Sequence, residues 1–368
     1  MAGTYPGSSK LLIEVEEQIA RLVGKEAALV FSIGFSTNST IIPSLVNHGC
    51  LILSAELNHA SIRFGTRLSG AAIEVFAHNS MASLEGRLRQ AISQGQPRTH
   101  RPWKKIMVTV EGLSQWKEQC FFIDEAYSIG ALGGQGRGVC DYFRVDPAEI
   151  DILMGTFTKS FGASGGYVAA SNAIIDKLRC INAGQIYGEV PTLPVLAQIS
   201  STLRLVADED PLHPGQGPER VPRLAFNSRY LRLGLKRLGF IVYGHDDSPI
   251  VPLMLYHPAK MPAFSREMLW RKISVVVVTY PATPLELSRA RLCVSAAHTK
   301  DDLDRVLKAC DEVGEALQLK FSSGIAGGLK EPMLNSSEST SKRKVEPPRW
   351  TLAEVVERGV GDAKLAFY

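Results

Sequence analysis

The sequence predicts an α/β protein with a large domain, built on a mostly parallel sheet, and a smaller C-terminal α+β domain. Two observations predict this class. Near-continuous apolar runs alternate with helical or loop stretches along the first half of the chain, which is typical of a parallel sheet covered by helices on both faces. The 368 residues also suffice for two domains. We place the large domain at residues 1–190, a linking helix with the small domain at 191–320, and a flexible tail at 321–368.

The large domain begins with an amphipathic helix over residues 8–24. Its apolar side chains recur at the spacing of one helical face, and Ser8 or Ser9 is available as the N-cap. The predicted strands that follow are "CLILSAEL" (50–57), "AAIEVFAH" (71–78), "KKIMVTVEG" (104–112), "CFFIDEA" (120–126), "DILMGTFT" (151–158) and "GGYVAAS" (165–171).

The small domain is predicted from a second group of strands, which follows a helix over residues 197–209. A helix over 300–320, with Thr299 as its N-cap, closes this domain. Residues 322–348 are rich in Ser, Gly, Pro and Lys, as flexible tails are. The strands of the second group are "GFIVYGHD" (239–246), "IVPLMLY" (250–256), "ISVVVVTYP" (273–281) and "RARLCVSAA" (289–297).

Composition and charge argue against several classes of protein. The net charge is only +4, and the basic residues are scattered apart from "RTHRPWKK" (98–105) and "SKRK" (341–344), so we expect no nucleic-acid binding. Six cysteines without a CxxC pair argue against a zinc site and a disulfide framework, and we expect no metal. No apolar run approaches the ~20 residues of a spanning helix, so we expect no membrane span.

One junction conflicts with the predicted sheet. Only "LSQWKEQ" (113–119) separates the strand ending in V-E-G from "CFFIDEA", whereas consecutive parallel strands need a crossover of about a dozen residues or more. Either these strands are not parallel neighbours, or the crossover between them is shortened.

A lysine follows one of the buried strands directly, in "GTFTKSFGASGG" (155–166). Burial lowers the pKa of a lysine, so an amine at the end of a buried strand is expected to be a competent nucleophile toward an aldehyde. Pyridoxal phosphate (PLP) is such an aldehyde. As a Schiff base on Lys159 it would also need a carboxylate for its pyridine nitrogen, a phosphate cradle and often a stacked ring.

Candidates for each of these groups are present. Asp124 ends a predicted strand, at the edge where ligands collect in such sheets. The loop "SIGFSTN" (32–38) opens a predicted helix, whose backbone N–H groups suit a phosphate. Thr156 and Thr158 add hydroxyls beside the lysine, and His59 offers an aromatic face.

Each candidate alone has a simpler interpretation. An isolated lysine is more often a solvated surface residue, and an aspartate after a strand is usually a cap or turn former. His59 alone is more often a hydrogen-bonded structural histidine. The stretch "GGQGRG" (133–138) lacks the G-x-G-x-x-G spacing of a dinucleotide site and is interpreted as a loop. The PLP hypothesis therefore depends on the combination.

Longer stretches of the sequence resemble one enzyme family. They are "LNHASIRFGTRLSGA" (57–71), "GQPRTHRPWKKI" (95–106), "FIDEAYSIGALGGQGRGVCDYF" (122–143), "GTFTKSFGASGGYV" (155–168), "PATPLELSRARLCVSAAHTKDDLD" (281–304) and "CDEVGEALQLK" (310–320). With one gap, residues 1–320 resemble the long-chain-base subunit 2 group of the serine palmitoyltransferases. These are α-oxoamine synthases, PLP-dependent enzymes of fold type I.

The resemblance implies a role for each candidate. Lys159 would hold the cofactor and move protons at the substrate Cα, Asp124 would pair with the pyridine nitrogen, and His59 would stack on the ring. Arg291 in "RARLCVSAAHT" would bind the substrate carboxylate, a task suited to a planar bidentate donor. The implied reaction condenses L-serine with palmitoyl-CoA to 3-ketosphinganine, CoA and CO2, in sphingolipid synthesis. The remaining cofactor residues would be Gly34, Phe35, Thr156 and Thr158.

The chain departs from the family pattern at three places. Tyr127 stands where the family has the histidine of D-E-A-H, and a tyrosine hydroxyl, with an ordinary pKa of about 10, does not titrate near neutrality. Segment 113–119 is shorter than the family's crossover, and the chain is expected to lack part of the family's N-terminal region. Three hypotheses stay open: the palmitoyltransferase, a paralogue that condenses an amino acid with a polyketide or other acyl chain, and a non-catalytic subunit.

The family also implies a partner. Its members form dimers with active sites at the subunit interface, and "IYGEVPTLP" (186–194) matches the segment that reaches toward the partner's cofactor. We expect a homodimer or a heterodimer with a subunit 1 homologue. The expected location is the endoplasmic reticulum membrane, reached through that partner, or the cytoplasm.

Overall fold

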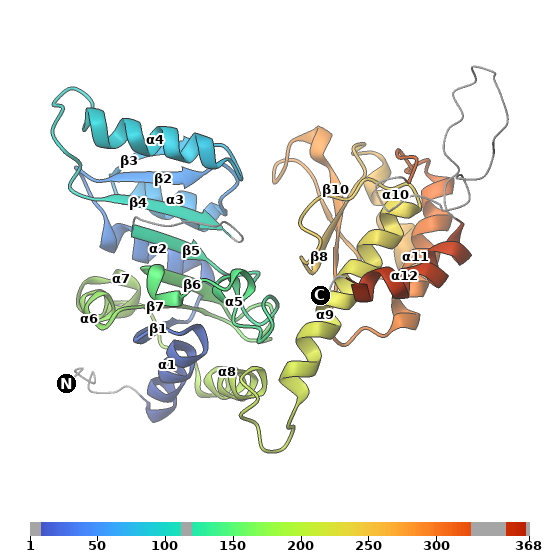
Figure 1. Ribbon diagram of the computed structural model, residues 1–368, viewed down its shortest axis with the longest axis horizontal. Helices are drawn as coiled ribbons and strands as arrows, with labels where there is room; N and C mark the ends of the chain where they lie inside the picture. The colour runs from blue at the N-terminus through green and yellow to red at the C-terminus, as the bar shows by residue number, and fades with distance from the viewer. Residues whose placement is uncertain (1–8, 112–119, 325–350, 366–368) are drawn as a thin grey trace. The chain divides into compact units, whose positions relative to one another are not determined.

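A seven-stranded sheet organises the N-terminal part of the chain in the computed structural model, which describes residues 9–111, 120–324 and 351–365 (Figure 1). The strand order is β1-β7-β6-β5-β4-β2-β3, in which β3, β2, β4, β5 and β6 run parallel and β7 is antiparallel to both of its neighbours. The predicted, mostly parallel α/β fold is confirmed. The strands are β1 (Ala27–Phe31), β2 (Leu51–Ala55), β3 (Ala72–Phe76), β4 (Ile106–Glu111), β5 (Cys120–Asp124), β6 (Ile152–Thr156) and β7 (Gly166–Ala170).

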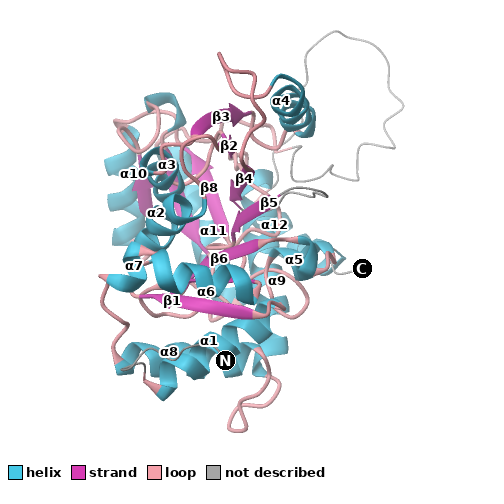
Figure 2. Ribbon diagram, turned by 90° about the vertical axis from the view of Figure 1, so that its left-hand side faces the viewer, coloured by secondary structure: helices cyan, strands magenta, loops and turns pink. Residues whose placement is uncertain are grey.

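Helices cover both faces of this sheet (Figure 2). Apolar residues of α1, α4 and α8 share one core cluster with one face, and those of α2, α3 and α6 share another with the opposite face. Helix α1 begins after Ser9, whose side chain accepts a hydrogen bond from the Leu12 N–H, as the sequence predicts. The helices are α1 (Lys10–Val23), α2 (Gly34–Leu45), α3 (Ala60–Leu68), α4 (Met81–Gln94), α5 (Val139–Phe143), α6 (Asn172–Ile181), α7 (Ala183–Ile186) and α8 (Leu193–Val206), with a 3-10 turn at Pro147–Glu149.

Strands β4 and β5 are parallel neighbours despite the short link between them. Their register places Glu111 opposite Asp124 and Met107 opposite Cys120. The first explanation of the short junction is therefore excluded, and the link 113–119 itself lies outside the described residues. Both strands end at the same edge, so their last residues lie side by side.

The C-terminal unit contains a three-stranded antiparallel sheet in the order β8-β10-β9. Thr299 and Asp302 form a capping box at the start of α11, which confirms the predicted N-cap. The elements are β8 (Ile250–Met254), β9 (Val276–Val278), β10 (Arg289–Cys293), α9 (Gln216–Arg237), α10 (Lys260–Trp270), α11 (Lys300–Ala316) and α12 (Leu352–Leu365), with a 3-10 turn at Leu285–Leu287.

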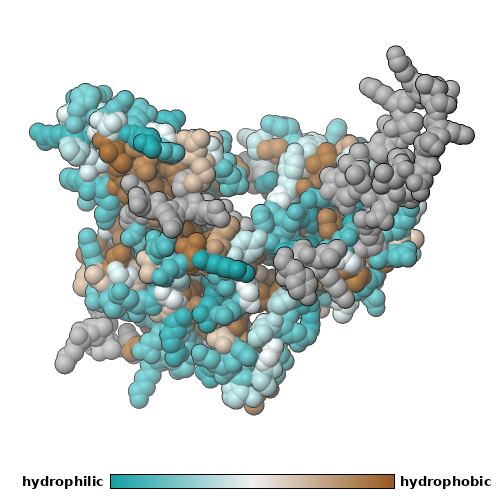
Figure 3. Space-filling view, viewed as in Figure 1, coloured by the Kyte–Doolittle hydropathy of each residue, from teal (hydrophilic) through white to brown (hydrophobic). Residues whose placement is uncertain are grey.

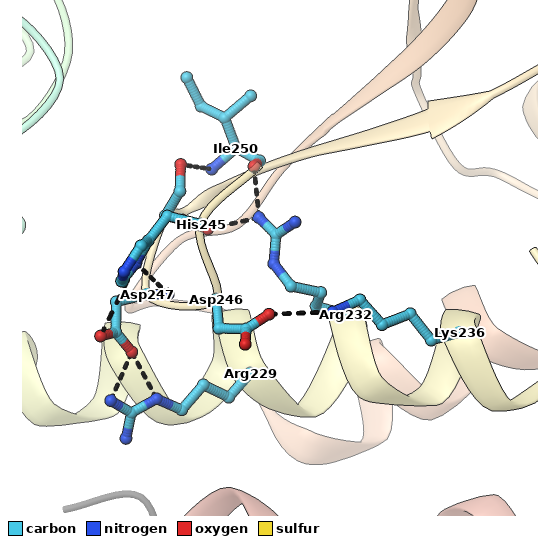
Figure 4. Close-up of polar contacts among 8 residues, drawn as sticks. Arg229, Arg232, Lys236, His245, Asp246, Asp247 and Ile250 are labelled. Carbon is cyan, nitrogen blue, oxygen red and sulfur yellow. Dashed lines mark hydrogen bonds and ion pairs between the residues drawn. The ribbon is translucent and has the colours of Figure 1, made fainter. Parts of the chain in front are cut away.

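A fully buried arginine holds the segment before β8 onto α9 (Figure 4). Arg232 donates hydrogen bonds to the carbonyl oxygens of Tyr243 at 2.6 Å and Ile250 at 2.7 Å. Arg229 on the same helix pairs with Asp247. The predicted strand 239–246 is wrong, because this run carries only an isolated bridge at Val242 and a side chain takes the Tyr243 carbonyl.

The two units divide between Val221 and Pro222, later than the expected boundary at residue 190. The reason is that α8 packs its apolar face on α1, within the N-terminal core. The flexible tail is wrong for residues 352–365, which form α12 and bury Val355 and Ala363. Residues 325–350 lie outside the described part of the chain.

Part of the apolar surface of the N-terminal unit is visible in Figure 3. Ile73 and Val75, on the edge strand β3, are exposed. A separate group lies between α7 and α8: Ile186, Tyr187, Val190 and Leu193 are 45%, 86%, 57% and 60% exposed. No helix within the described ranges combines the length and apolar character that crossing a membrane requires.

Candidate functional site

A buried carboxylate lies at the carboxyl end of β5. Asp124 is 3% exposed and accepts hydrogen bonds from the Ala126 N–H at 2.9 Å and from Asn38 Nδ2 at 2.8 Å. Burial raises its pKa, while these two donors and the charges of Lys159 and His59 act in the opposite direction. A cationic group placed against Asp124 would therefore stabilise its ionised form.

A chain of hydrogen bonds joins this carboxylate to His59. Asn38 Nδ2, on α2, also donates to Ser61 Oγ at 3.0 Å, and Ser61 Oγ lies 2.7 Å from His59 Nδ1. The Ser61 N–H donates to the same nitrogen at 3.2 Å, so His59 caps helix α3. Because Nδ1 accepts, the neutral ring carries its proton on Nε2. The ring also contacts Phe35 edge-on, with centroids 6.4 Å apart.

A second carboxylate ends the neighbouring strand. Glu111 lies opposite Asp124 in the β4–β5 register, and its Oε2 accepts a hydrogen bond from the His59 N–H at 2.9 Å. Burial, followed by the charge of Asp124, raises the pKa of Glu111 to about 7, while the His59 N–H and the charge of Lys159 lower it. The site thus contains a carboxyl group that titrates near neutrality.

Lys159 lies in the loop between β6 and β7. Its Nζ donates to Thr156 Oγ1 at 3.4 Å and lies 3.9 Å from the centroid of the Tyr127 ring, a cation–π distance. The expected desolvation is wrong, because Lys159 stands three residues beyond the last residue of the strand and its side chain is exposed. Its charge nevertheless acts on both Asp124 and Glu111.

The start of α2 forms a close backbone approach beside the same loop. The N-cap Ile33 makes no side-chain hydrogen bond, so the first N–H groups of the helix lack a capping side chain. A Cβ at Gly34 would lie 2.9 Å from Thr156 Cγ2 and 3.2 Å from the Gly165 oxygen, so a larger residue does not fit without a shift. The Thr156 and Thr158 hydroxyl oxygens are 3.1 Å apart. Uncapped N–H groups beside two hydroxyls suit a phosphate group.

Most of the predicted residues therefore come together in the N-terminal unit, but Arg291 belongs to the other unit. It lies in the middle of β10, opposite Pro252 on β8 and Val276 on β9. Its side chain is half-buried, and its Nε has no hydrogen-bond partner within the described residues. Its role toward a substrate carboxylate stays a prediction.

Sequence reasoning missed three residues of this site: Asn38, Ser61 and Glu111. Each lies within a stretch that the sequence singles out, since Asn38 ends "SIGFSTN", Ser61 lies in "LNHASIRFGTRLSGA" and Glu111 is the Glu of V-E-G. The usable signal for Glu111 was its place at the end of a predicted strand, the same place that identified Asp124.

Comparison with known proteins assigns the family. The model of the family "Aminotransferase class I and II" matches residues 4–310. The chain belongs to this family. It is 55% identical to serine palmitoyltransferase 2 of Schizosaccharomyces pombe over 381 aligned positions, which cover 99% of this chain and 62% of the relative. It is 49% identical to long chain base biosynthesis protein 2a of Oryza sativa, over 86% of this chain and 67% of the relative.

Solved structures agree with this assignment. A structure of serine palmitoyltransferase with a PLP internal aldimine has a TM-score of 0.75 at 28% identity, over 85% of this chain and 78% of that one. The Sphingomonas wittichii enzyme gives the same TM-score at 25% identity and the same coverage. The fold is that of PLP-dependent aminotransferases, and the resemblance to the serine palmitoyltransferase group is confirmed.

This chain corresponds to only part of the length of its yeast relatives. This chain spans less than two thirds of the yeast relatives, 62% of the Schizosaccharomyces pombe protein and 64% of the Saccharomyces cerevisiae protein. The alignments of 381 and 374 positions are also longer than this chain of 368 residues. Both relatives therefore carry residues, inside the aligned region, that this chain lacks.

Proposed function

We propose that this chain is a PLP-dependent acyltransferase that condenses L-serine with palmitoyl-CoA, giving 3-ketosphinganine, CoA and CO2. One observation carries the proposal: the hydrogen-bonded series Asp124, Asn38, Ser61 and His59 lies at the same edge of the sheet as Lys159. The names of the relatives supply the reaction.

The residues of this edge fit PLP group by group. Asp124 is a buried carboxylate that a pyridinium would stabilise, and the Asn38 and Ala126 donors orient it. The start of α2, with Thr156 and Thr158, suits the phosphate. When bound, the cofactor supplies an electron sink for the bonds at the substrate α-carbon.

The chain's own side chains would then do the binding and the proton transfers. The Lys159 amine is exposed beside Thr156 and Tyr127, so it can link to the cofactor and later hold a proton at the substrate Cα. Tyr127, whose ring centroid lies 3.9 Å from Lys159 Nζ, would take the place of the family's histidine and donate a hydrogen bond from its hydroxyl. Arg291 would bind the serine carboxylate through its planar guanidinium.

We also propose that the active form is a dimer. The exposed apolar group Ile186, Tyr187, Val190 and Leu193 supports this, because an apolar stretch of this kind is typical of a surface that another chain covers. It falls within the 186–194 segment that matches the family's interface. The partner would be a second copy or a subunit 1 homologue, and association with the endoplasmic reticulum membrane would come through that partner.

Two observations favour a second candidate, a non-catalytic subunit. Tyr127 removes a group that titrates near neutrality, and the β4–β5 link is shorter than a parallel crossover requires. The retained Lys159 opposes it, because a structural subunit has no need of that amine. The paralogue with another acyl donor shares the site and differs only in substrate.

Product formation tests the proposal. Purified protein, alone and with a subunit 1 homologue, is incubated with PLP, L-serine and palmitoyl-CoA, and 3-ketosphinganine is measured by mass spectrometry. Product that disappears in the Asp124→Asn variant supports the acyltransferase. Bound PLP without product from any of a series of acyl-CoA donors refutes it and favours the non-catalytic subunit.

A further inference from the structure

The proposed reaction leaves one carboxyl group of the site without a role. Glu111 is the last residue of β4, and Asp124 is the last residue of β5. These residues are directly paired in the parallel register, and paired residues of adjacent strands project their side chains to the same face of a sheet. Two carboxyl groups therefore share the edge at which Lys159 lies.

Glu111 is hydrogen-bonded to His59, the residue expected to stack on the cofactor ring. Its Oε2 accepts the backbone N–H of His59 at 2.9 Å. His59 is the N-cap of α3, and its ring nitrogen is already fixed by Ser61. The side chain of Glu111 therefore fixes the backbone of His59, while Ser61 fixes the ring.

The charges around Glu111 come from three different elements among the described residues. Asp124 on β5 repels its ionised form, whereas Lys159 on the β6–β7 loop and the His59 N–H before α3 stabilise that form. Tyr127 completes the group through its ring contact with the lysine. Desolvation is the largest effect on the pKa of Glu111, which is raised to about 7. The ionised fraction of Glu111 thus changes within the range of physiological pH.

We propose that Glu111 is a positioning residue of the cofactor site, which holds His59 in place and adds a second negative charge beside Asp124 and Lys159. The inference rests on the proposed binding of PLP and concerns how that site responds to pH. An added anion stabilises a positive charge nearby. Glu111 should therefore favour the protonated, cationic form of the linkage between Lys159 and the cofactor.

Two substitutions separate the two parts of this role. Glu111→Gln keeps an oxygen that can accept the His59 N–H but removes the charge, whereas Glu111→Ala removes both. Glu56→Gln is the matched control, because Glu56 follows β2 at the same edge of the sheet but is exposed. The probe is PLP itself, and the readouts are its dissociation constant and the pH titration of its visible absorbance when bound. Circular dichroism checks that each variant is folded.

The expected results differ between the variants. Glu111→Gln lowers the midpoint of the absorbance titration by about one pH unit and changes PLP affinity little. Glu111→Ala shifts the midpoint similarly and weakens PLP binding about tenfold, since a hydrogen bond to a charged group is lost. The control matches the wild type in both readouts.

Other outcomes would overturn the inference. An unchanged midpoint in Glu111→Gln refutes the charge effect, and equal PLP affinity in the Gln and Ala variants refutes the positioning role. Either result, with normal PLP binding in the wild type, leaves the proposed acyltransferase standing. A wild type that binds no PLP refutes both proposals, whereas the expected shifts without 3-ketosphinganine refute only the reaction.

Discussion

Glu125 should make the stability of the protein depend on pH. It is fully buried, its Oε1 accepts the Val139 N–H at 2.7 Å, and its Oε2 has no hydrogen-bond partner within the described residues. Burial raises the pKa of Glu125 from 4.5 to about 8, and the charge of Asp124 acts in the same direction. The folded state therefore keeps a proton that the unfolded state releases above pH 4.5.

The sign and size of the effect follow from this difference. Between pH 4.5 and about 8 the folded state binds more protons, so the free energy of unfolding falls as the pH rises. Each pKa unit corresponds to about 1.4 kcal/mol, so the loss across the whole window is about 5 kcal/mol. Glu125→Gln has the shape of the protonated acid and cannot ionise. Its stability relative to the wild type should therefore rise by about 1.4 kcal/mol per pH unit within this window.

Urea unfolding followed by circular dichroism at pH 6, 7 and 8 measures this difference. Glu149→Gln, at an exposed position, is the control and should run parallel to the wild type. Parallel curves for the wild type and Glu125→Gln would refute the reasoning, because they would mean that Glu125 has the same proton affinity in the folded and unfolded states.

Three further substitutions test individual contacts. Asn38→Ala removes the donor shared by Asp124 and Ser61 and should weaken PLP binding about tenfold in an absorbance titration; unchanged binding would contradict the orienting role. Arg291→Lys should raise the KM for L-serine about tenfold without changing PLP affinity, because the bidentate contact is lost; an unchanged KM would place the carboxylate elsewhere. Tyr127→His restores a group that titrates near neutrality and should increase turnover about tenfold or more; a flat response would show that the tyrosine is not limiting.

Much of the fold was predictable because apolar runs mark buried strands directly. The mostly parallel sheet follows from such runs, and Ser9 and Thr299 act as the expected helix caps. The predicted strand that the structure lacks was lost to a tertiary contact. The run 239–246 has strand composition, but Arg232 takes a carbonyl that a neighbouring strand would need. The sequence did not predict helix α12, because the Ser-, Gly-, Pro- and Lys-rich run 322–348 that precedes it is typical of a flexible tail.

The sequence predicted the main chemical groups of the site but not the hydrogen bonds that hold them. Lys159, Asp124 and His59 carry recognisable motifs, whereas Asn38 and Glu111 become informative only when the strand order places them beside Asp124. The sequence did not predict the exposure of Lys159, because strand β6 ends three residues before it, at Thr156. The distances between side chains at a sheet edge depend on which strands are neighbours and in what register, and the sequence alone does not predict either.

The most direct test of the central claim, a PLP linked to Lys159 in the loop after β6, is the visible absorbance spectrum of purified protein with added PLP, before and after L-serine. Lys159→Ala is the test variant, and Lys177→Ala, at an exposed position on α6, is the control. We predict a visible band in the wild type and in the control that changes on addition of L-serine and is absent from Lys159→Ala. A band that persists in Lys159→Ala, or no band in the wild type, would contradict the account.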